Sequence, residues 1–141
     1  FEYLCSHKGF TRAIGDMIVG ARQRAQLRQC DFTITREDLI SRLEAQRGLC
    51  AVTGVPFSLA GKLKGAKRPN RMSVDRIDRT GGYTPGNSRI TTAIANVAMM
   101  DWEFEDFVDM CRAVAELHRR RGTPLLSEQV MKVKRANGSR R

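Results

Sequence analysis

Apolar residues recur at helical spacing in two segments of the N-terminal third. From Phe10 to about Cys30 they return every three or four positions, the spacing of one face of an α-helix, and several arginines fill the other positions. This segment therefore predicts a basic amphipathic helix. Its predicted inner face consists of Phe10, Ile14, Met17, Ile18, Ala21 and Ala25. A shorter helix is predicted from Thr35, where Thr-x-x-Asp has the form of a capping box, to Gly48, a residue type that often follows a helix.

The central part of the chain has shorter apolar runs, which favour strands. Residues 49–57 mix apolar residues with Gly and Pro and predict a tight strand–turn unit. Residues 72–77 and 87–91 each predict a short strand, and residues 93–98 predict a short helix that contains Asn96. The predicted order is strand, loop, strand, helix. Its packing is expected to come from Leu49, Val52, Val55, Phe57, Ile77, Ile90, Ile94 and the last helix.

A long helix is predicted to follow, with Asp101 as its cap. Acidic residues lie early in it and Arg119, Arg120 and Arg121 lie at its end, which agrees with the helix dipole at both ends. Its predicted inner stripe is Phe104, Phe107, Val108, Cys111, Val114 and Ala115, with His118 on the same face. Trp102 is interpreted as part of the packing rather than as a surface for base stacking.

These elements predict an α+β fold in three parts. Residues 1–47 form basic N-terminal helices, residues 48–121 form a hairpin–helix core with a long packing helix, and residues 122–141 form a basic tail. The tail is interpreted as an appendage that orders on a partner or as a remnant outside the fold. With 141 residues, 41% of them hydrophobic, the chain is long enough for one domain with a core.

The charge balance favours a polyanionic partner. Lys and Arg number 25 against 15 Asp and Glu, a net charge of +10, which is typical of nucleic-acid-binding proteins. There are two weaker alternatives. The protein is basic but has no polyanionic partner, or it lies on anionic lipid. No apolar run approaches the ~20 residues that span a bilayer, so no membrane insertion is expected. The four cysteines form no C-x-x-C pair, so we expect no structural zinc and a reducing compartment, either bacterial cytoplasm or an organelle interior.

Basic residues concentrate in the segment 58–71, which has no acidic residue. We predict that this loop contacts phosphate groups, with a simple solvated linker as the equally weighted alternative. Its basic residues are Lys62, Lys64, Lys67, Arg68 and Arg71.

A polar constellation follows in the hairpin itself. Asp75 and Arg76 end the first predicted strand, Asn87 lies eleven positions after Arg76, and Asn96 lies nine further on. Together with C-x-x-T-G at residues 50–54, S-x-D-R-I-D from residue 73 and G-Y-T-P-G-N ending at Asn87, this pattern resembles phage-type HNH endonucleases of the ββα-metal fold. The resemblance covers about residues 48–100.

The resemblance implies roles for these residues. Asp75 and Asn96 would supply oxygen ligands to Mg²⁺ or another divalent cation, and Asn87 would hydrogen-bond across the loop and hold a general base in place. Arg79 and Arg89 are further candidates for nucleic-acid contacts, and DNA is favoured over RNA. In the loop, Gly81, Gly82 and Gly86 are expected to allow positive φ where the turn needs it, and Pro85 to fix one turn.

Position 76 departs from the family pattern, which has a histidine there. A guanidinium group stays protonated at neutral pH, so Arg76 cannot be the general base, although it could stabilise a pentavalent phosphate. Tyr83, Asp78 or a second metal-bound water remain alternatives for the base. His7 and His118 lie outside the matching region.

Two functions from different classes follow. The first is a metal-dependent nuclease that cleaves DNA. The second is a catalytically silent module of the same fold that binds DNA or RNA within a larger nucleoprotein assembly. A third, weaker hypothesis is that the basic tail binds a protein and that nucleic acid is incidental.

Overall fold

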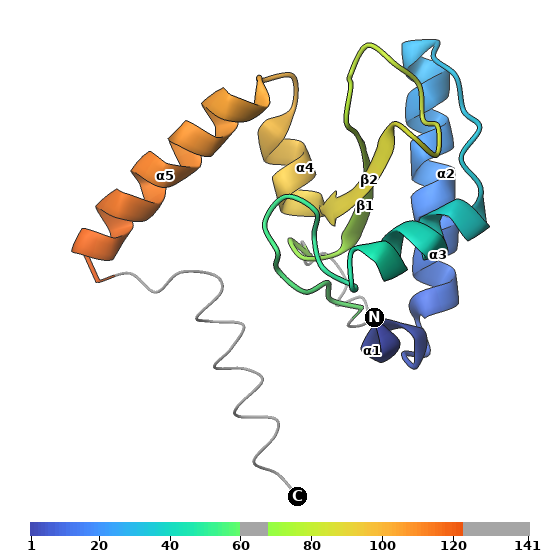
Figure 1. The fold of residues 1–141 in the computed structure, drawn as a ribbon, viewed down its shortest axis with the longest axis horizontal. Helices are drawn as coiled ribbons and strands as arrows, with labels where there is room; N and C mark the ends of the chain where they lie inside the picture. Colours follow the sequence, from blue (N-terminus) through green and yellow to red (C-terminus); the bar gives the residue numbers. More distant parts are fainter. Residues whose placement is uncertain (60–67, 123–141) are drawn as a thin grey trace, which may run out of the picture. The chain divides into compact units, whose positions relative to one another are not determined.

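The computed structural model describes residues 1–59 and 68–122, and its contacts divide the chain into two compact units, residues 1–100 and 101–141. The predicted α+β class is confirmed. The grouping differs from the predicted segments, because the N-terminal helices share a unit with the hairpin and the last helix belongs to the other unit. In chain order (Figure 1), the elements are α1 (Glu2–Cys5), α2 (Phe10–Arg28), α3 (Arg36–Ala45), β1 (Met72–Arg76), β2 (Ser88–Thr92), α4 (Ala93–Met99) and α5 (Phe104–Arg120).

Helices α2 and α3 form where the sequence pattern places them. The predicted inner face of α2 is buried except for Ile18, which is half-buried, and α2 ends where Gln29 adopts a left-handed conformation. In α3 the predicted capping box is present: Asp38 N donates to Thr35 Oγ1 at 3.1 Å, and Thr35 N donates to the Asp38 carboxylate at 2.8 Å. These two bonds satisfy backbone donors that the first helical turn leaves without partners.

The two strands pair as an antiparallel hairpin, as predicted. The register runs from Met72 opposite Thr92 to Arg76 opposite Ser88. Helices α2 and α3 contact the hairpin on the side of the buried pair Val74 and Ile90, and α4 contacts it on the other side (Figure 1). On that side the Asn96 side chain reaches Ser73. Because successive side chains of a strand point to opposite faces, each strand contributes to both layers.

The core of residues 1–100 differs from the one predicted around the hairpin. Phe57 and Ile90 are buried and Val52 is half-buried, but Leu49, Ile77 and Ile94 are 36%, 54% and 51% exposed. Ile77 lies beyond the end of β1, and Ile94 lies on the outer side of α4, so the hairpin alone encloses neither. The N-terminal helices supply the missing apolar surface. Their largest fully buried side chains are Leu4, Ile14, Leu39 and Leu43.

The unit formed by residues 101–141 contains α5. The helix begins at Phe104 after Glu103, so the prediction that Asp101 caps it was wrong, whereas the acidic first turn and basic last turn are confirmed. Arg119 and Arg120 both pair with Glu116, one helical turn earlier. Trp102 is 66% exposed, which contradicts its predicted packing. Within the described part of the predicted stripe Phe107 alone is buried, and the exposed members are Phe104, Cys111 and Val114.

Candidate functional site

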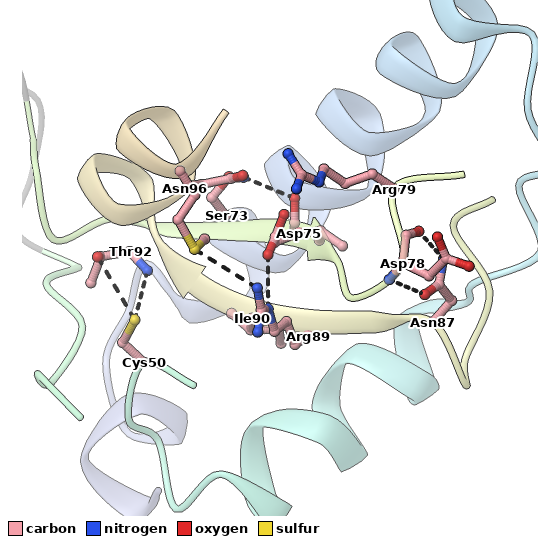
Figure 2. Close-up of polar contacts among 12 residues, drawn as sticks. Cys50, Ser73, Asp75, Asp78, Arg79, Asn87, Arg89, Ile90, Thr92 and Asn96 are labelled. Atoms are coloured by element: carbon pink, nitrogen blue, oxygen red, sulfur yellow. Dashed lines mark hydrogen bonds and ion pairs between the residues drawn. The ribbon is translucent and has the colours of Figure 1, made fainter. Parts of the chain in front are cut away.

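Asp75 and Asn96 lie on the same face of the hairpin, the one covered by α4. Asn96 and Ser73 are labelled in Figure 2, and the Asn96 amide nitrogen donates to Ser73 Oγ at 2.8 Å. The same nitrogen donates to the Val74 carbonyl at 3.1 Å. A carbonyl can only accept, so these bonds fix which end of the amide faces β1. Ser73 and Asp75 are two residues apart on one strand and therefore share a face. The hairpin and α4 thus bring residues 21 positions apart onto one surface, and their roles as metal ligands stay predictions.

The Asp75 carboxylate is engaged by an arginine of the neighbouring strand. Arg89 lies directly opposite Asp75 in the register, and its Nε donates to Asp75 Oδ2 at 2.8 Å (Figure 2). The two side chains are only 22% and 15% exposed, and Arg89 Nη2 also lies 3.8 Å from Met99 Sδ of α4. The guanidinium predicted to contact nucleic acid is therefore directed at the predicted metal ligand.

This ion pair determines how well the site fits a divalent cation. Mg²⁺ is commonly held by one or two carboxylates together with waters, so Asp75 with the Asn96 amide oxygen is a sparse but recognisable donor set. The described residues contain no cluster of three His, Cys, Asp or Glu side chains that would add to it. Because Arg89 places a positive charge on the single carboxylate, the side chains as arranged do not fit a divalent cation unless Arg89 releases Asp75.

Arg76, one residue further along β1, belongs to the opposite face. Its Nη1 donates to the Gly81 carbonyl at 2.7 Å and lies 3.8 Å from Cys30 Sγ, and its guanidinium lies 5.4 Å from the centroid of the Tyr83 ring. Arg24 of α2 lies over the same ring and donates to the Tyr83 hydroxyl and to the Val74 carbonyl. Arg76 therefore connects β1 to the loop and to Cys30, which follows α2, and its predicted action on a phosphate beside Asp75 has no support in this geometry.

Asn87 holds the loop between the strands closed. Its Oδ1 accepts from the Asp78 backbone N–H at 2.7 Å, and its Nδ2 donates to the carbonyls of Asp78 at 2.8 Å and Gly82 at 2.9 Å (Figure 2). The hydrogen bonding across the loop is as the resemblance implies, whereas a role in positioning a general base stays a prediction. All three hydrogen bonds go to backbone atoms, so the contribution of Asn87 in this structure is to loop geometry.

The loop glycines serve close approach rather than unusual backbone angles. The glycines with positive φ in the described chain are Gly48, Gly54 and Gly122, so the expectation of positive φ in this loop was wrong. A Cβ added at Gly81 would lie 2.8 Å from Asn87 Nδ2, and one at Gly82 would lie 2.5 Å from the Asp31 carbonyl. Side chains at these two positions would push the loop away from Asn87 and from the end of α2.

Neither side chain considered as the alternative base is well placed for that role. Tyr83 is 3% exposed, and its hydroxyl accepts from Arg24 Nε at 3.1 Å. Asp78 Oδ1 accepts from the hydroxyl and the backbone N–H of Thr80, and these hydrogen bonds lower the pKa of Asp78. A carboxylate with a lowered pKa is a weaker base at neutral pH.

Apart from Arg89, which pairs with Asp75, the predicted nucleic-acid-binding residues separate into three groups. Lys62, Lys64 and Lys67 lie outside the described residues. Arg79 lies in the loop after β1, and its Nη1 is 3.4 Å from the Met100 carbonyl at the end of α4. Arg68 and Arg71 line a cavity beside the start of α2. That cavity also contains Lys8 and Arg12, which the sequence interpretation did not single out.

The sequence interpretation missed two contacts on the face covered by α4. They are the hydrogen bond of Ser73 with Asn96 and the ion pair of Arg89 with Asp75. Ser73 accepts the Asn96 hydrogen bond, and strand alternation from Asp75 was the signal that could have placed it there. The pairing of Arg89 with Asp75 required the register, which depends on where the long loop closes. Comparisons of the chain with protein-family models, with curated proteins and with solved structures gave no match, so the HNH resemblance rests on the residues and geometry described above.

Proposed function

We propose that this chain binds nucleic acid, DNA in preference to RNA, through an HNH-like hairpin–helix module that is catalytically silent as folded. The main observation that supports silence is the 2.8 Å ion pair between Asp75 and Arg89. It neutralises the carboxylate that an HNH site would use for its cation. The HNH resemblance of residues 48–100 supports the choice of module, and a larger nucleoprotein assembly is the partner we propose for it.

The charge of the chain supports the binding part of the proposal. A net charge of +10 on 141 residues attracts a polyanion over a wide surface and speeds its association. On the hairpin side, Arg79 lies beside the end of α4, and Arg68 and Arg71 precede β1. No helix in the described part of the chain has the length and apolar character of a membrane span.

The side chains around Asp75 support the silent part. Arg76 stands where the family pattern has a histidine, and it contacts Gly81 and Tyr83 on the other face of β1. Tyr83 is buried and hydrogen-bonded to Arg24. A water molecule near Asp75 therefore has no evident proton acceptor among the side chains that the resemblance assigns to this role.

Binding is tested by fluorescence anisotropy with a labelled duplex DNA and the matching RNA at several salt concentrations. We expect the affinity to fall steeply with salt, by about one unit of log–log slope for each phosphate contact. Asp75→Ala should bind as tightly as the wild type, because the carboxylate makes no contact with the polyanion in this proposal. Salt-independent binding, or no binding to either nucleic acid, contradicts the proposal.

Metal-dependent phosphodiester hydrolysis is the second candidate function. The placement of Asp75 and Asn96 on the face covered by α4 favours it. The test is nicking of supercoiled plasmid with Mg²⁺ or Mn²⁺. Nicking by the wild type that is lost in Asp75→Ala and retained in His118→Ala would replace the silent module with a nuclease. Absence of nicking under both ions supports the silent module.

A pair of variants asks whether silence comes from Arg89, from Arg76 or from both. Arg89→Gln releases the Asp75 carboxylate, and Arg76→His restores the residue type of the family pattern. We expect neither variant alone to nick plasmid, because each leaves the other obstacle in place. Nicking by Arg89→Gln alone would assign silence entirely to the ion pair.

A further inference from the structure

A second candidate site lies at the other end of β1, in a cavity of about 380 Å³. The residues around the α1–α2 junction form one side of it, and Ser58, Leu59, Arg68 and Arg71 form the other. Met72, the first residue of β1, also lines it, so the cavity lies three residues, or about 10 Å of strand, from Asp75. Its charged and titratable lining residues are His7, Lys8, Arg12, Asp16, Arg68 and Arg71.

The lining is strongly basic. The lining contains four basic side chains, those of Lys8, Arg12, Arg68 and Arg71. Among the described lining residues, the one acidic side chain is that of Asp16. Within the described chain, Lys8, Arg12 and Arg71 form no ion pair with an acidic side chain, although Asp16 is one helical turn from Arg12. Like charges gathered around a hollow repel one another, so an anion inside it is stabilised by all of them.

The backbone that carries these side chains is held from several directions. Ser58 N donates to the Asn70 carbonyl at 2.9 Å beside the cavity. Ala93 N donates to the Arg71 carbonyl at 2.9 Å, and Ile94 N donates to the Pro69 carbonyl at 3.0 Å. The start of α4 thus fixes the segment that carries Arg71 and Arg68. Basic side chains from distant parts of the chain are thus carried by backbone segments that hydrogen bonds hold in place.

The opposite wall is fixed by a local contact. Gly9 N donates to His7 Nδ1 at 3.0 Å, which orients the imidazole and leaves its other nitrogen turned away from this bond. Lys8 and Arg12 lie on either side of Gly9, before and within the first turn of α2. The volume is at the lower end of the range for small-molecule sites, which suits a phosphate group with the sugar attached to it.

We infer that this cavity binds the phosphate monoester of a nucleotide. Arginine side chains match phosphate oxygens with paired N–H donors, and several cations suit a dianionic monoester better than a singly charged phosphodiester. The monoester can belong to the end of a nucleic-acid strand or to a free nucleotide. The strand end is the source that rests on the function proposed above, and the cavity itself does not depend on that function.

The cavity is tested first with a mononucleotide, by calorimetric titration at constant ionic strength. We expect deoxyadenosine monophosphate to bind and deoxyadenosine to show no binding. Arg12→Gln and Arg71→Gln should each weaken binding of the monophosphate by about tenfold or more, the loss expected for one charged hydrogen bond. Arg28→Gln is the matched control, because it removes the same charge from the exposed far end of α2 and should leave the affinity unchanged.

Folding of the variants is checked by thermal unfolding, because Arg12 and Arg71 are exposed and their loss should not change the melting temperature. Equal binding of the nucleoside and the monophosphate overturns the inference. A loss in Arg28→Gln as large as that in Arg12→Gln also overturns it, since the effect would then come from overall charge.

A second experiment separates the two sources of the phosphate. Oligonucleotides with and without a 5′-phosphate are compared by fluorescence anisotropy in the wild type and in Arg12→Gln. Tighter binding of the phosphorylated strand that disappears in Arg12→Gln supports the strand end, and indifference to the 5′-phosphate alongside mononucleotide binding supports a free nucleotide. If oligonucleotides bind but no monophosphate or 5′-phosphate is recognised, the cavity inference fails while nucleic-acid binding stands.

Discussion

The two faces of β1 use neighbouring charged residues in opposite ways. On the α4 face, Asp75 pairs with Arg89 from the next strand, and the pair lies beside the amide of Asn96. On the α2 face, Arg76 bonds to the Gly81 carbonyl and lies over the ring of the buried Tyr83. Asp75 and Arg76 are adjacent in the sequence, and both were expected in the site. Because their side chains lie on opposite faces of β1, they do not act together. One belongs to the candidate site and the other to the packing.

The largest change in the free energy of unfolding is expected for a residue in the core of the hairpin. It tests which side of the hairpin packs into that core. Ile90 is fully buried on the α2 face, so Ile90→Ala should lower the free energy of unfolding by about 2–5 kcal/mol. Ile94→Ala, on the exposed side of α4, should change it by less than about 0.5 kcal/mol. Urea unfolding of both variants measures the difference. Equal losses would mean that the α4 side is also enclosed.

Arg76→Gln tests the packing role of the second charged residue. The variant loses a charged hydrogen bond to Gly81 and a contact with an aromatic face, so we expect a loss of about 2 kcal/mol in the free energy of unfolding. Affinity for DNA should fall only slightly, as for any single charge. A stable variant with greatly weakened binding would return Arg76 to the nucleic-acid surface.

The ion pair on the α4 face is expected to contribute less to stability. A double-mutant cycle with Asp75→Asn and Arg89→Gln should give a coupling free energy of about 1 kcal/mol, because the pair is partly exposed and screened. Unfolding at low and high salt checks the estimate, and the coupling should shrink as salt is added. A coupling near zero would show that the pair does not persist in solution, which would remove the main support for a silent site.

The smallest effect concerns the loop that joins the two faces. Hydrogen bonds from the Thr80 hydroxyl and backbone lower the folded-state pKa of Asp78, so this carboxylate contributes stability above its unfolded pKa of about 4. That contribution is lost as the pH falls through the folded pKa. Asp78→Asn should therefore be less stable than the wild type near pH 7, and the difference should narrow below about pH 4. A difference that stays constant from pH 7 to pH 3 would contradict this origin.

Local patterns predicted much of the fold. The period of apolar residues located α2, the Thr35–Asp38 pair located the start of α3, and the apolar patterns of residues 72–77, 87–91 and 93–98 predicted a hairpin followed by a helix. Each of these signals depends on neighbours within a few residues. The prediction failed for Ile77, Ile94 and Trp102, which are apolar but exposed. Apolar character alone does not say which surface a neighbouring element covers.

Local sequence patterns predict the helices, the hairpin and the basic charge, and the sequence contains one carboxylate and two asparagines at HNH-like spacing. The contacts of those groups follow from how the elements pack. Pairing of the strands set Arg89 against Asp75, and strand alternation turned Arg76 toward Tyr83. Packing of α2 against β1 brought Lys8 and Arg12 to the same cavity as Arg68 and Arg71. The physical reason is that side-chain charges act over a few ångströms through space, and the folded chain places residues more than fifty positions apart within that distance.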